Sequence, residues 1–130
     1  MTDEHRHEYI QLLDRIIAAA ESGDATDIFE VYAPDAQIWH NHDDRVQTVE
    51  QNARLLTRMA EWVADRRYTD RRIHVFEGGV VQQHVLRGTH RASGEELAMN
   101  ACVVALVGED GRITRLDEYI DSAQAARFRP

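Results

Sequence analysis

Two side chains in strand-like segments could carry acid/base chemistry in this chain. His40 ends the segment YAPDAQIWHN, in which a Pro-Asp turn precedes the alternating residues Ile38, Trp39 and His40. Glu118 lies in the last strand-like segment, GRITRLDEYID. A neutral imidazole, whose ordinary pKa is about 6.5, can abstract a proton near neutral pH, and a carboxyl group can give or take one. His40 and Glu118 are therefore the candidate catalytic residues.

Two further histidines occupy a later strand-like segment that ends in LRGTHRASG. His84 and His90 have the same parity as Leu86 and Gly88, so all four are expected on one side of the strand, with His84 deeper and His90 near the rim. Either histidine could also be an ordinary core or rim residue. Two histidines and a glutamate can hold a metal ion, but no HExxH spacing accompanies them, and we expect neither a metal nor a cofactor.

Apolar residues at helical spacing predict three helices before the sheet. They are Tyr9, Leu12, Leu13, Ile16, Ile17 and Ala20 in the first helix, Ile28, Phe29 and Tyr32 in the second, and Leu55, Leu56, Met59, Trp62 and Val63 in the third. The segment Ser22-Gly23-Asp24 ends the first helix, and Pro34-Asp35 ends the second. Thr48 is a candidate N-cap for the third helix.

The rest of the chain predicts strands. A short strand at 36–40 and a polar loop at 41–47 precede the third helix, and long strands are expected at 68–77, 80–91, 95–107 and 112–120. Because glycine-containing turns join these long strands, they predict an antiparallel meander. A bent sheet packed on helices leaves a cavity at its open end. Besides His84, Leu86 and His90, the expected lining is Ile16, Leu55, Met59, Trp62, Met99, Ala101 and Val103. This lining implies a small hydrophobic molecule as ligand.

The helix pair before the YA-x-DA turn and the long sheet after it resemble the nuclear transport factor 2-like superfamily, most of all its SnoaL-like and ketosteroid isomerase branch. The resemblance covers nearly the whole chain. It implies an α+β fold: a cone-shaped α+β barrel, with three N-terminal helices packed on a strongly curved, mostly antiparallel sheet. Ketosteroid isomerases carry a catalytic aspartate at the position of His40, and SnoaL-like cyclases carry an acid/base aspartate at that of Glu118. The family pattern places Leu116, Glu118 and Ile120 inward, and Asp117 and Tyr119 outward.

The chain also departs from these relatives. Ile16 and Val103 stand where ketosteroid isomerases use a tyrosine and a protonated aspartate to hold the dienolate oxygen, and neither can donate a hydrogen bond. Steroid isomerisation by that mechanism is therefore not expected. Limonene-epoxide-hydrolase-like chemistry needs an Asp-Arg-Asp set around a water, and the strand parities show no inward arginine.

These features predict a cofactor-independent isomerase, cyclase or dehydratase acting on a small hydrophobic carbonyl compound such as a polyketide or steroid-like molecule. Burial in an apolar cone should raise the pKa of Glu118, and a charged histidine nearby would oppose that rise. The alternative is a non-catalytic domain of the same fold that binds a hydrophobic ligand or a protein. His40 would then be a structural histidine, and Glu118 would only anchor a ligand or a water.

Length and charge limit the remaining possibilities. With 130 residues the chain fits a single domain over 1–130. Its net charge of −8 and the lack of a basic cluster argue against nucleic acid or a membrane surface as partners. The single cysteine, Cys102, favours a cytoplasmic location. Outward apolar residues such as Cys102, Val104 and Leu106 predict a homodimer through the outer sheet face, as the resemblance also implies.

Overall fold

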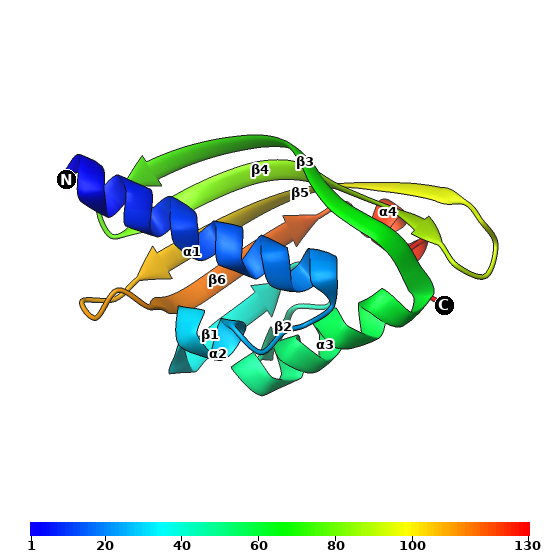
Figure 1. Cartoon of the computed structure of the whole chain (residues 1–130), viewed down its shortest axis with the longest axis horizontal. Coiled ribbons are helices and arrows are strands. Elements are labelled where there is room, and N and C mark those ends of the chain that lie inside the picture. The colour runs from blue at the N-terminus through cyan, green and yellow to red at the C-terminus, as the bar shows by residue number, and fades with distance from the viewer.

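Helices and strands follow one another in the order of an α+β fold in the computed structural model, which describes residues 1–130 (Figure 1). The elements are α1 (Asp3–Ser22), α2 (Ile28–Val31), β1 (Tyr32–His40), β2 (Arg45–Gln47), α3 (Val49–Trp62), β3 (Val63–Phe76), β4 (Gly79–His90), β5 (Glu96–Val107), β6 (Ile113–Ile120) and α4 (Ser122–Ala126). The fold class is the expected one.

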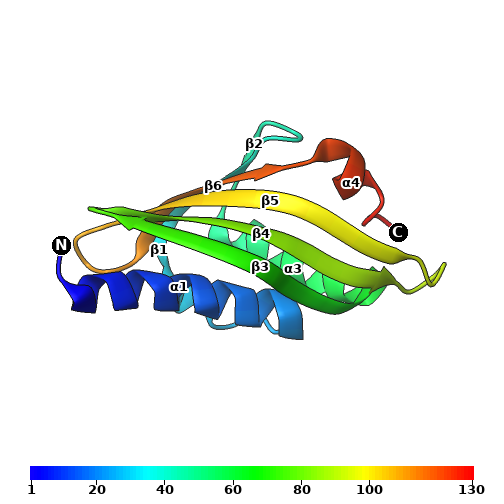
Figure 2. The same cartoon turned by 90° about the horizontal axis from the view of Figure 1, so that it is seen from above.

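The six strands form one curled, unclosed sheet in the order β2-β1-β6-β5-β4-β3. Neighbouring strands are antiparallel except β1 and β6, which run parallel. Seen from above, α1 and α3 lie on one side of the sheet, where they cover its concave face (Figure 2). The parallel contact matters most for the site, because it brings the ends of β1 and β6 side by side.

Local sequence signals explain where the two long helices begin and end. The hydroxyl of Thr2 caps α1, and Gly23, with φ 81°, ends it in the left-handed conformation that glycine adopts without strain. Thr48 and Gln51 form a reciprocal capping box at the start of α3. The N-cap predicted at Thr48 is therefore confirmed.

Several predicted boundaries are wrong. Helix α2 is a single turn, and Tyr32 belongs to β1 rather than to a helix. Strand β3 begins at Val63, which pairs with His90, so the predicted helix end and the start of the next strand both shift. Two short elements were not predicted at all. β2 consists of Arg45, Val46 and Gln47, which are too few to show an apolar pattern, and α4 follows an N-cap at Asp121.

Strand β3 contains two bulges that change which side chains face inward. Asp65 and Asp70 adopt positive φ values of 54° and 56°, and each lies where the pairing with β4 gains one residue. An extra residue reverses the alternation beyond it. Arg66 and Arg71 therefore face the helices, which overturns the expectation that no arginine points inward. Arg66 donates to the carbonyl groups of Ala20 and Glu21 at the end of α1.

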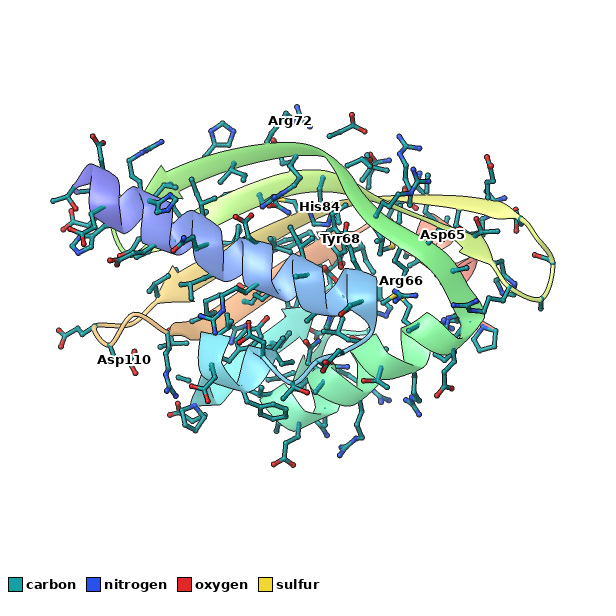
Figure 3. All side chains as sticks on the ribbon, in the orientation of Figure 1. Asp65, Arg66, Tyr68, Arg72, His84 and Asp110 are labelled. Carbon is teal, nitrogen blue, oxygen red and sulfur yellow. The ribbon has the colours of Figure 1, made fainter.

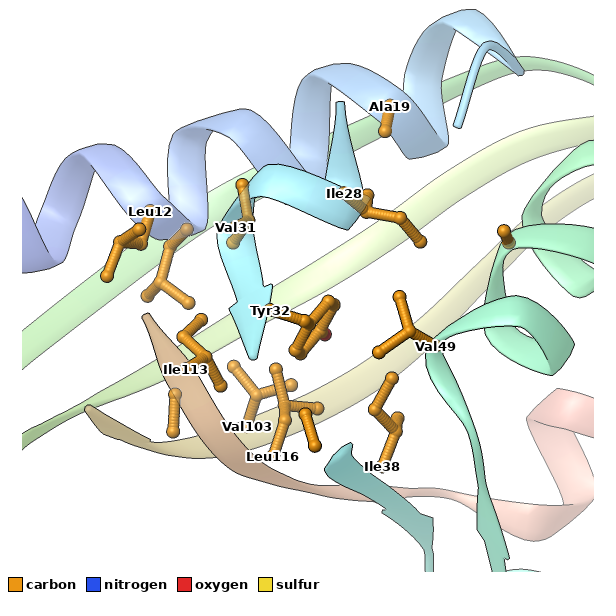
Figure 4. Close-up of a cluster of buried hydrophobic side chains, with 14 of the residues drawn as sticks. Leu12, Ala19, Ile28, Val31, Tyr32, Ile38, Val49, Val103, Ile113 and Leu116 are labelled. Atoms are coloured by element: carbon orange, nitrogen blue, oxygen red, sulfur yellow. The ribbon is translucent and has the colours of Figure 1, made fainter. Parts of the chain in front are cut away.

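The core lies between the helices and the concave sheet face and consists of two clusters. In the larger one, Tyr32 packs among aliphatic side chains from α1, α2, α3 and the sheet, including Ile28, Val49 and Leu116 (Figure 4). The smaller cluster joins Phe128 near the C-terminus to four side chains of the sheet, namely Val63, Leu86, Leu97 and Met99. The C-terminal segment thus closes one end of the cone.

Candidate active site

An enclosed cavity of about 80 Å³ lies between the concave sheet face and the helices. Most of its wall is aliphatic or thioether surface from Leu13, Ile16, Ile17, Leu55, Leu56, Met59, Leu86, Met99, Val103 and Leu116. The polar lining residues are Tyr32, His40, Asn52, Tyr68, Gln82, His84 and Glu118. Glu118 is the only carboxylate in this wall, and no lysine or arginine joins it.

His40 and Glu118 meet inside this cavity. They are direct partners in the parallel pairing of β1 with β6, so their side chains leave the sheet on the same face. Nε2 of His40 lies 3.3 Å from Oε1 of Glu118, and the two side chains are 8% and 21% exposed. The structure therefore places a titratable pair in a largely apolar surrounding, which is a common feature of functional sites.

The two groups perturb each other's pKa in opposite directions. Burial is the largest influence on Glu118 and favours its neutral form, but the hydrogen bond and charge of His40, with the charges of His84 and His42, outweigh it. The pKa of Glu118 therefore lies below its usual value, which overturns the expectation of a raised one. For His40, burial disfavours the imidazolium, but Glu118 and Asp43 outweigh this effect and hold the pKa of His40 above 6.5.

His84 has the opposite character. Burial lowers the pKa of its imidazole below 6.5, Arg71 adds to this effect, and Glu118 opposes it. Its Nδ1 atom lies 2.9 Å from Nε2 of Gln82. Its ring lies against that of Tyr68, with centroids 4.8 Å apart, and both side chains sit between α1 and the sheet (Figure 3). The cavity thus contains one histidine that favours the charged form and one that favours the neutral form.

The two phenols of the lining remain neutral donors. Burial, followed by the charge of Glu118, raises the pKa of both Tyr32 and Tyr68 far above the usual range. Sequence reasoning did not assign either residue to the site, because Tyr32 was placed in a helix and Tyr68 begins a predicted strand. Gln82 was missed too, although it shares the parity of His84.

Ten of the residues proposed from the sequence line the cavity: Ile16, His40, Leu55, Met59, His84, Leu86, Met99, Val103, Leu116 and Glu118. The other four lie outside its wall: Trp62, His90, Ala101 and Ile120. Trp62 and Ile120 pack instead against the cluster that contains Phe128. His90 Nε2 contacts the carbonyl oxygen of Arg129 at 2.6 Å. The unpredicted C-terminal segment therefore occupies the end of the cone near Trp62, His90 and Ile120, whereas Ala101 contributes to a separate open groove.

A larger, open groove of about 640 Å³ lies on the outer face of the sheet, where Arg72, Gln83, Asn100 and Tyr119 contribute to its wall. The groove is wide and solvent-exposed. The cavity between the helices and the sheet is the better candidate site, because it holds the pair of buried His40 and half-buried Glu118. No group of three or more histidine, cysteine, aspartate or glutamate side chains is placed to hold a metal ion. None of the helices is both long and apolar enough to cross a membrane.

Comparison with known families identifies the fold family. The model of the SnoaL-like domain matches residues 13–116, which is most of the chain. The chain therefore belongs to the SnoaL-like domain family, as the sequence resemblance indicated. A comparison with curated proteins found no match.

Solved structures share the same architecture. TsrD from Streptomyces laurentii is 22% identical, with a TM-score of 0.79 and 94% of each chain covered. IdmH from Streptomyces antibioticus, a candidate polyketide cyclase, is 20% identical, with a TM-score of 0.78, 91% of this chain covered and 95% of that one. A candidate isomerase from Bacillus subtilis is 13% identical, with a TM-score of 0.81 and coverages of 98% and 94%. At these identities the likeness concerns the fold.

Proposed function

We propose that this protein is a cofactor-independent acid/base enzyme, an isomerase, cyclase or dehydratase, acting on a small hydrophobic carbonyl compound. The observation that carries the proposal is the 3.3 Å contact between His40 and Glu118 inside an otherwise apolar cavity. Membership of the SnoaL-like domain family, together with the likeness in fold to a candidate polyketide cyclase and a candidate isomerase, supports this reaction class.

His40 is the proposed base. When its imidazole is neutral and Nε2–H points to Glu118, the lone pair of Nδ1 can accept a proton from carbon next to the substrate carbonyl. The electron pair of the broken C–H bond moves into an enolate, and the carboxylate of Glu118 stabilises the imidazolium that forms. The same proton can then return to another carbon or to a leaving oxygen. His40 can act as a base only when its imidazole is neutral. Its pKa lies above 6.5, so the rate should rise as the pH increases through the pKa of His40.

The wall indicates what kind of substrate fits. Glu118 is already paired with His40 and no other charged side chain lines the cavity, so an uncharged molecule with one polar end is favoured. The cavity of about 80 Å³ is well below the roughly 150 Å³ that holds benzene in an engineered apolar cavity. A ring-sized substrate therefore requires the walls to move.

The second candidate is a hydrophobic-ligand-binding domain, favoured by the largely apolar lining. Deuterium exchange separates it from an enzyme. Small cyclic ketones, such as cyclopentanone and cyclohexenone, are incubated with the protein in D2O, and loss of the protons next to the carbonyl is followed by NMR. The enzyme should accelerate this exchange, and His40→Ala and Glu118→Gln should each slow it by about 10² to 10⁴-fold, with little change in ketone affinity.

A binding domain predicts the reverse pattern. Met99→Ala would weaken ketone binding because it removes apolar wall, Glu118→Gln would leave binding nearly unchanged, and no variant would alter exchange. Trp62→Ala is a matched control, because Trp62 is a large apolar residue of α3 that lies outside the cavity wall. Exchange that is no faster than in buffer would refute the proposed enzyme.

A further inference from the structure

A chain of polar contacts runs from the surface of α1 through β3 and β4 into the cavity. Nη2 of Arg71 lies 2.7 Å from Oδ1 of Asp14 on α1. Nε of Arg71 donates to Oε1 of Gln82 over 2.9 Å, and Nε2 of Gln82 lies 2.9 Å from Nδ1 of His84. Gln82 is 1% exposed and His84 is 5% exposed, so the contact between them is shielded from solvent, whereas the contact of Arg71 with Gln82 is partly buried. The chain ends at a cavity histidine that the proton transfer by His40 and Glu118 does not use.

The chemistry of the donors determines how each group is oriented. An arginine guanidinium can only donate, so the atom of Gln82 that faces Arg71 must be the carbonyl oxygen. The amide NH2 of Gln82 then faces His84 and donates to Nδ1. Nδ1 must therefore carry a lone pair, and the ring proton must be on Nε2. A proton on Nδ1 would place two donors against each other.

The remaining nitrogen of His84 is available to a ligand. Nε2 makes no hydrogen bond within the protein. Nε2 also retains some accessible surface. The side-chain polar atoms that are fully buried and lack a hydrogen-bond partner are Trp62 Nε1 and His90 Nδ1, and Nε2 of His84 is not among them. His84 lines the cavity as well as part of the open groove, and because Nδ1 is held by Gln82, Nε2–H is the ring donor left for a ligand. The bulge at Asp70 makes this arrangement possible, because it turns Arg71 toward Gln82.

We propose that His84 is a catalytic residue that donates an Nε2–H hydrogen bond to the carbonyl oxygen of the substrate, with Gln82 and Arg71 as its positioning residues. This inference rests on the proposed function of the cavity. As His40 takes the proton from carbon, negative charge develops on the carbonyl oxygen, and His84 stabilises that charge without giving up its own proton. A neutral donor suits this role because it cannot protonate the base. It supplies the donor that Ile16 and Val103 lack, and such donors contribute about 10² to 10³-fold in rate.

The first test needs no substrate. NMR of protein labelled with nitrogen-15 at histidine distinguishes the two neutral tautomers and the imidazolium. His84 should be neutral with its proton on Nε2 in the wild-type protein at neutral pH. A proton on Nδ1 at neutral pH would overturn the proposal.

A charge change at Gln82 tests the positioning. In Gln82→Glu, a carboxylate accepts from both Arg71 and Nδ1–H of His84, so the pKa of His84 should rise even though Arg71, Glu118 and Tyr68 are unchanged. The matched control is Gln83→Glu, which adds the same charge at the next residue of β4, on the opposite face of the strand, and should leave the tautomer and pKa of His84 unaltered. Equal effects of the two substitutions would contradict a specific contact.

Phenol and toluene test whether Nε2–H of His84 donates to a ligand oxygen. Phenol has a hydroxyl group where toluene has a methyl group, and that hydroxyl oxygen takes the place of the substrate carbonyl oxygen. Phenol should bind more tightly than toluene, and His84→Leu should reduce this preference by about tenfold, the value of one hydrogen bond. Should His84→Leu fail to fold, the wild-type Nε2 resonance gives the same answer, since phenol should shift it and toluene should not. If phenol has no preference over toluene, or if neither binds, the proposal is wrong.

These measurements separate this inference from the proposed function, because none of them requires turnover. A failure here, combined with ketone exchange that depends on His40, would remove His84 from the mechanism and leave the acid/base pair in place. A phenol preference that depends on His84, combined with no exchange, would instead leave an oxygen-binding site without catalysis.

Discussion

The pair of His40 and Glu118 makes a prediction about stability as a function of pH. Folding lowers the pKa of Glu118. Its contribution to the free energy of unfolding is therefore present above its pKa in the unfolded chain, about 4.5, and is lost as pH falls through the folded pKa. The pKa of His40 is raised, so its contribution is complete below about 6.5 and is lost as pH rises through the folded pKa. The two windows overlap between about pH 4.5 and 6.5. Glu118→Gln should therefore cost most stability in that range.

The geometry sets the size of this effect. The contact is 3.3 Å long, and both side chains are less than one third exposed, so solvent screens the pair only partly. An exposed ion pair contributes at most about 1 kcal/mol and breaking a buried one costs about 3 to 5 kcal/mol, so this partly shielded ion pair gives an expected loss of about 2 kcal/mol near pH 5.5. At a pH well above the folded pKa of His40, the imidazole is neutral in both proteins, and the difference in unfolding free energy between them should fall below about 1 kcal/mol.

Urea unfolding at several pH values measures this difference directly, and a loss of about 2 kcal/mol corresponds to a midpoint shift of about 1 M. The matched control is Asp117→Asn on the outer face of the same strand. Asp117 pairs with Arg115, Oδ1 to Nε, at 2.8 Å, and arginine does not titrate in this range, so its effect should be the same at all these pH values. A Glu118→Gln effect that is flat with pH, or largest near pH 9, would refute the coupling.

Three further predictions concern the rest of the fold. We propose a homodimer through the outer sheet face, where Leu106 is 42% and Tyr119 is 47% exposed. The double variant Leu106→Glu and Tyr119→Glu should therefore be a monomer by light scattering. A wild-type monomer at micromolar concentration would count against the dimer. Phe128→Ala should cost about 3 kcal/mol in urea unfolding and speed toluene binding, because Phe128 closes one end of the cone; unchanged binding kinetics would exclude this role. Gly88→Ala should cost about 1 to 3 kcal/mol, because its Cβ would lie 2.5 Å from Cγ1 of Val63, and a neutral result would show that β3 can move aside.

Periodicity was enough to predict the elements that bury a regular apolar face. Helices α1 and α3 and strands β4, β5 and β6 all match such patterns, and the cap at Thr48 has its own local signal. The elements that were missed depend on partners far away in sequence. Strand β2 exists because it pairs with β1, and α4 lies where Phe128 can pack on the sheet. The pairing of β2 cannot be seen in a short window of residues, and the only local signal for α4 is its N-cap at Asp121.

The candidate site shows the same division. Alternation along β1 and β6, with its parity taken from the family resemblance, placed His40 and Glu118 on one face, but their contact depends on the parallel register of the two strands. The direction of the pKa shift of Glu118 depends on that distance, so burial alone predicted the wrong sign. The contact of Arg71 with Gln82 was out of reach as well. A bulge at Asp70 shifts the strand parity by one residue, and no local residue pattern indicates it.

A double-mutant cycle on ketone exchange in D2O tests the central claim, that His40 and Glu118 act as one proton-transfer unit. Rates are measured for the wild-type protein, His40→Ala, Glu118→Gln and the double variant, with folding checked by circular dichroism. If the two side chains form a unit, the double variant should exchange at about the rate of the slower single variant, because each substitution alone already disables the pair. Losses that multiply in the double variant, or full exchange in Glu118→Gln, would contradict the account.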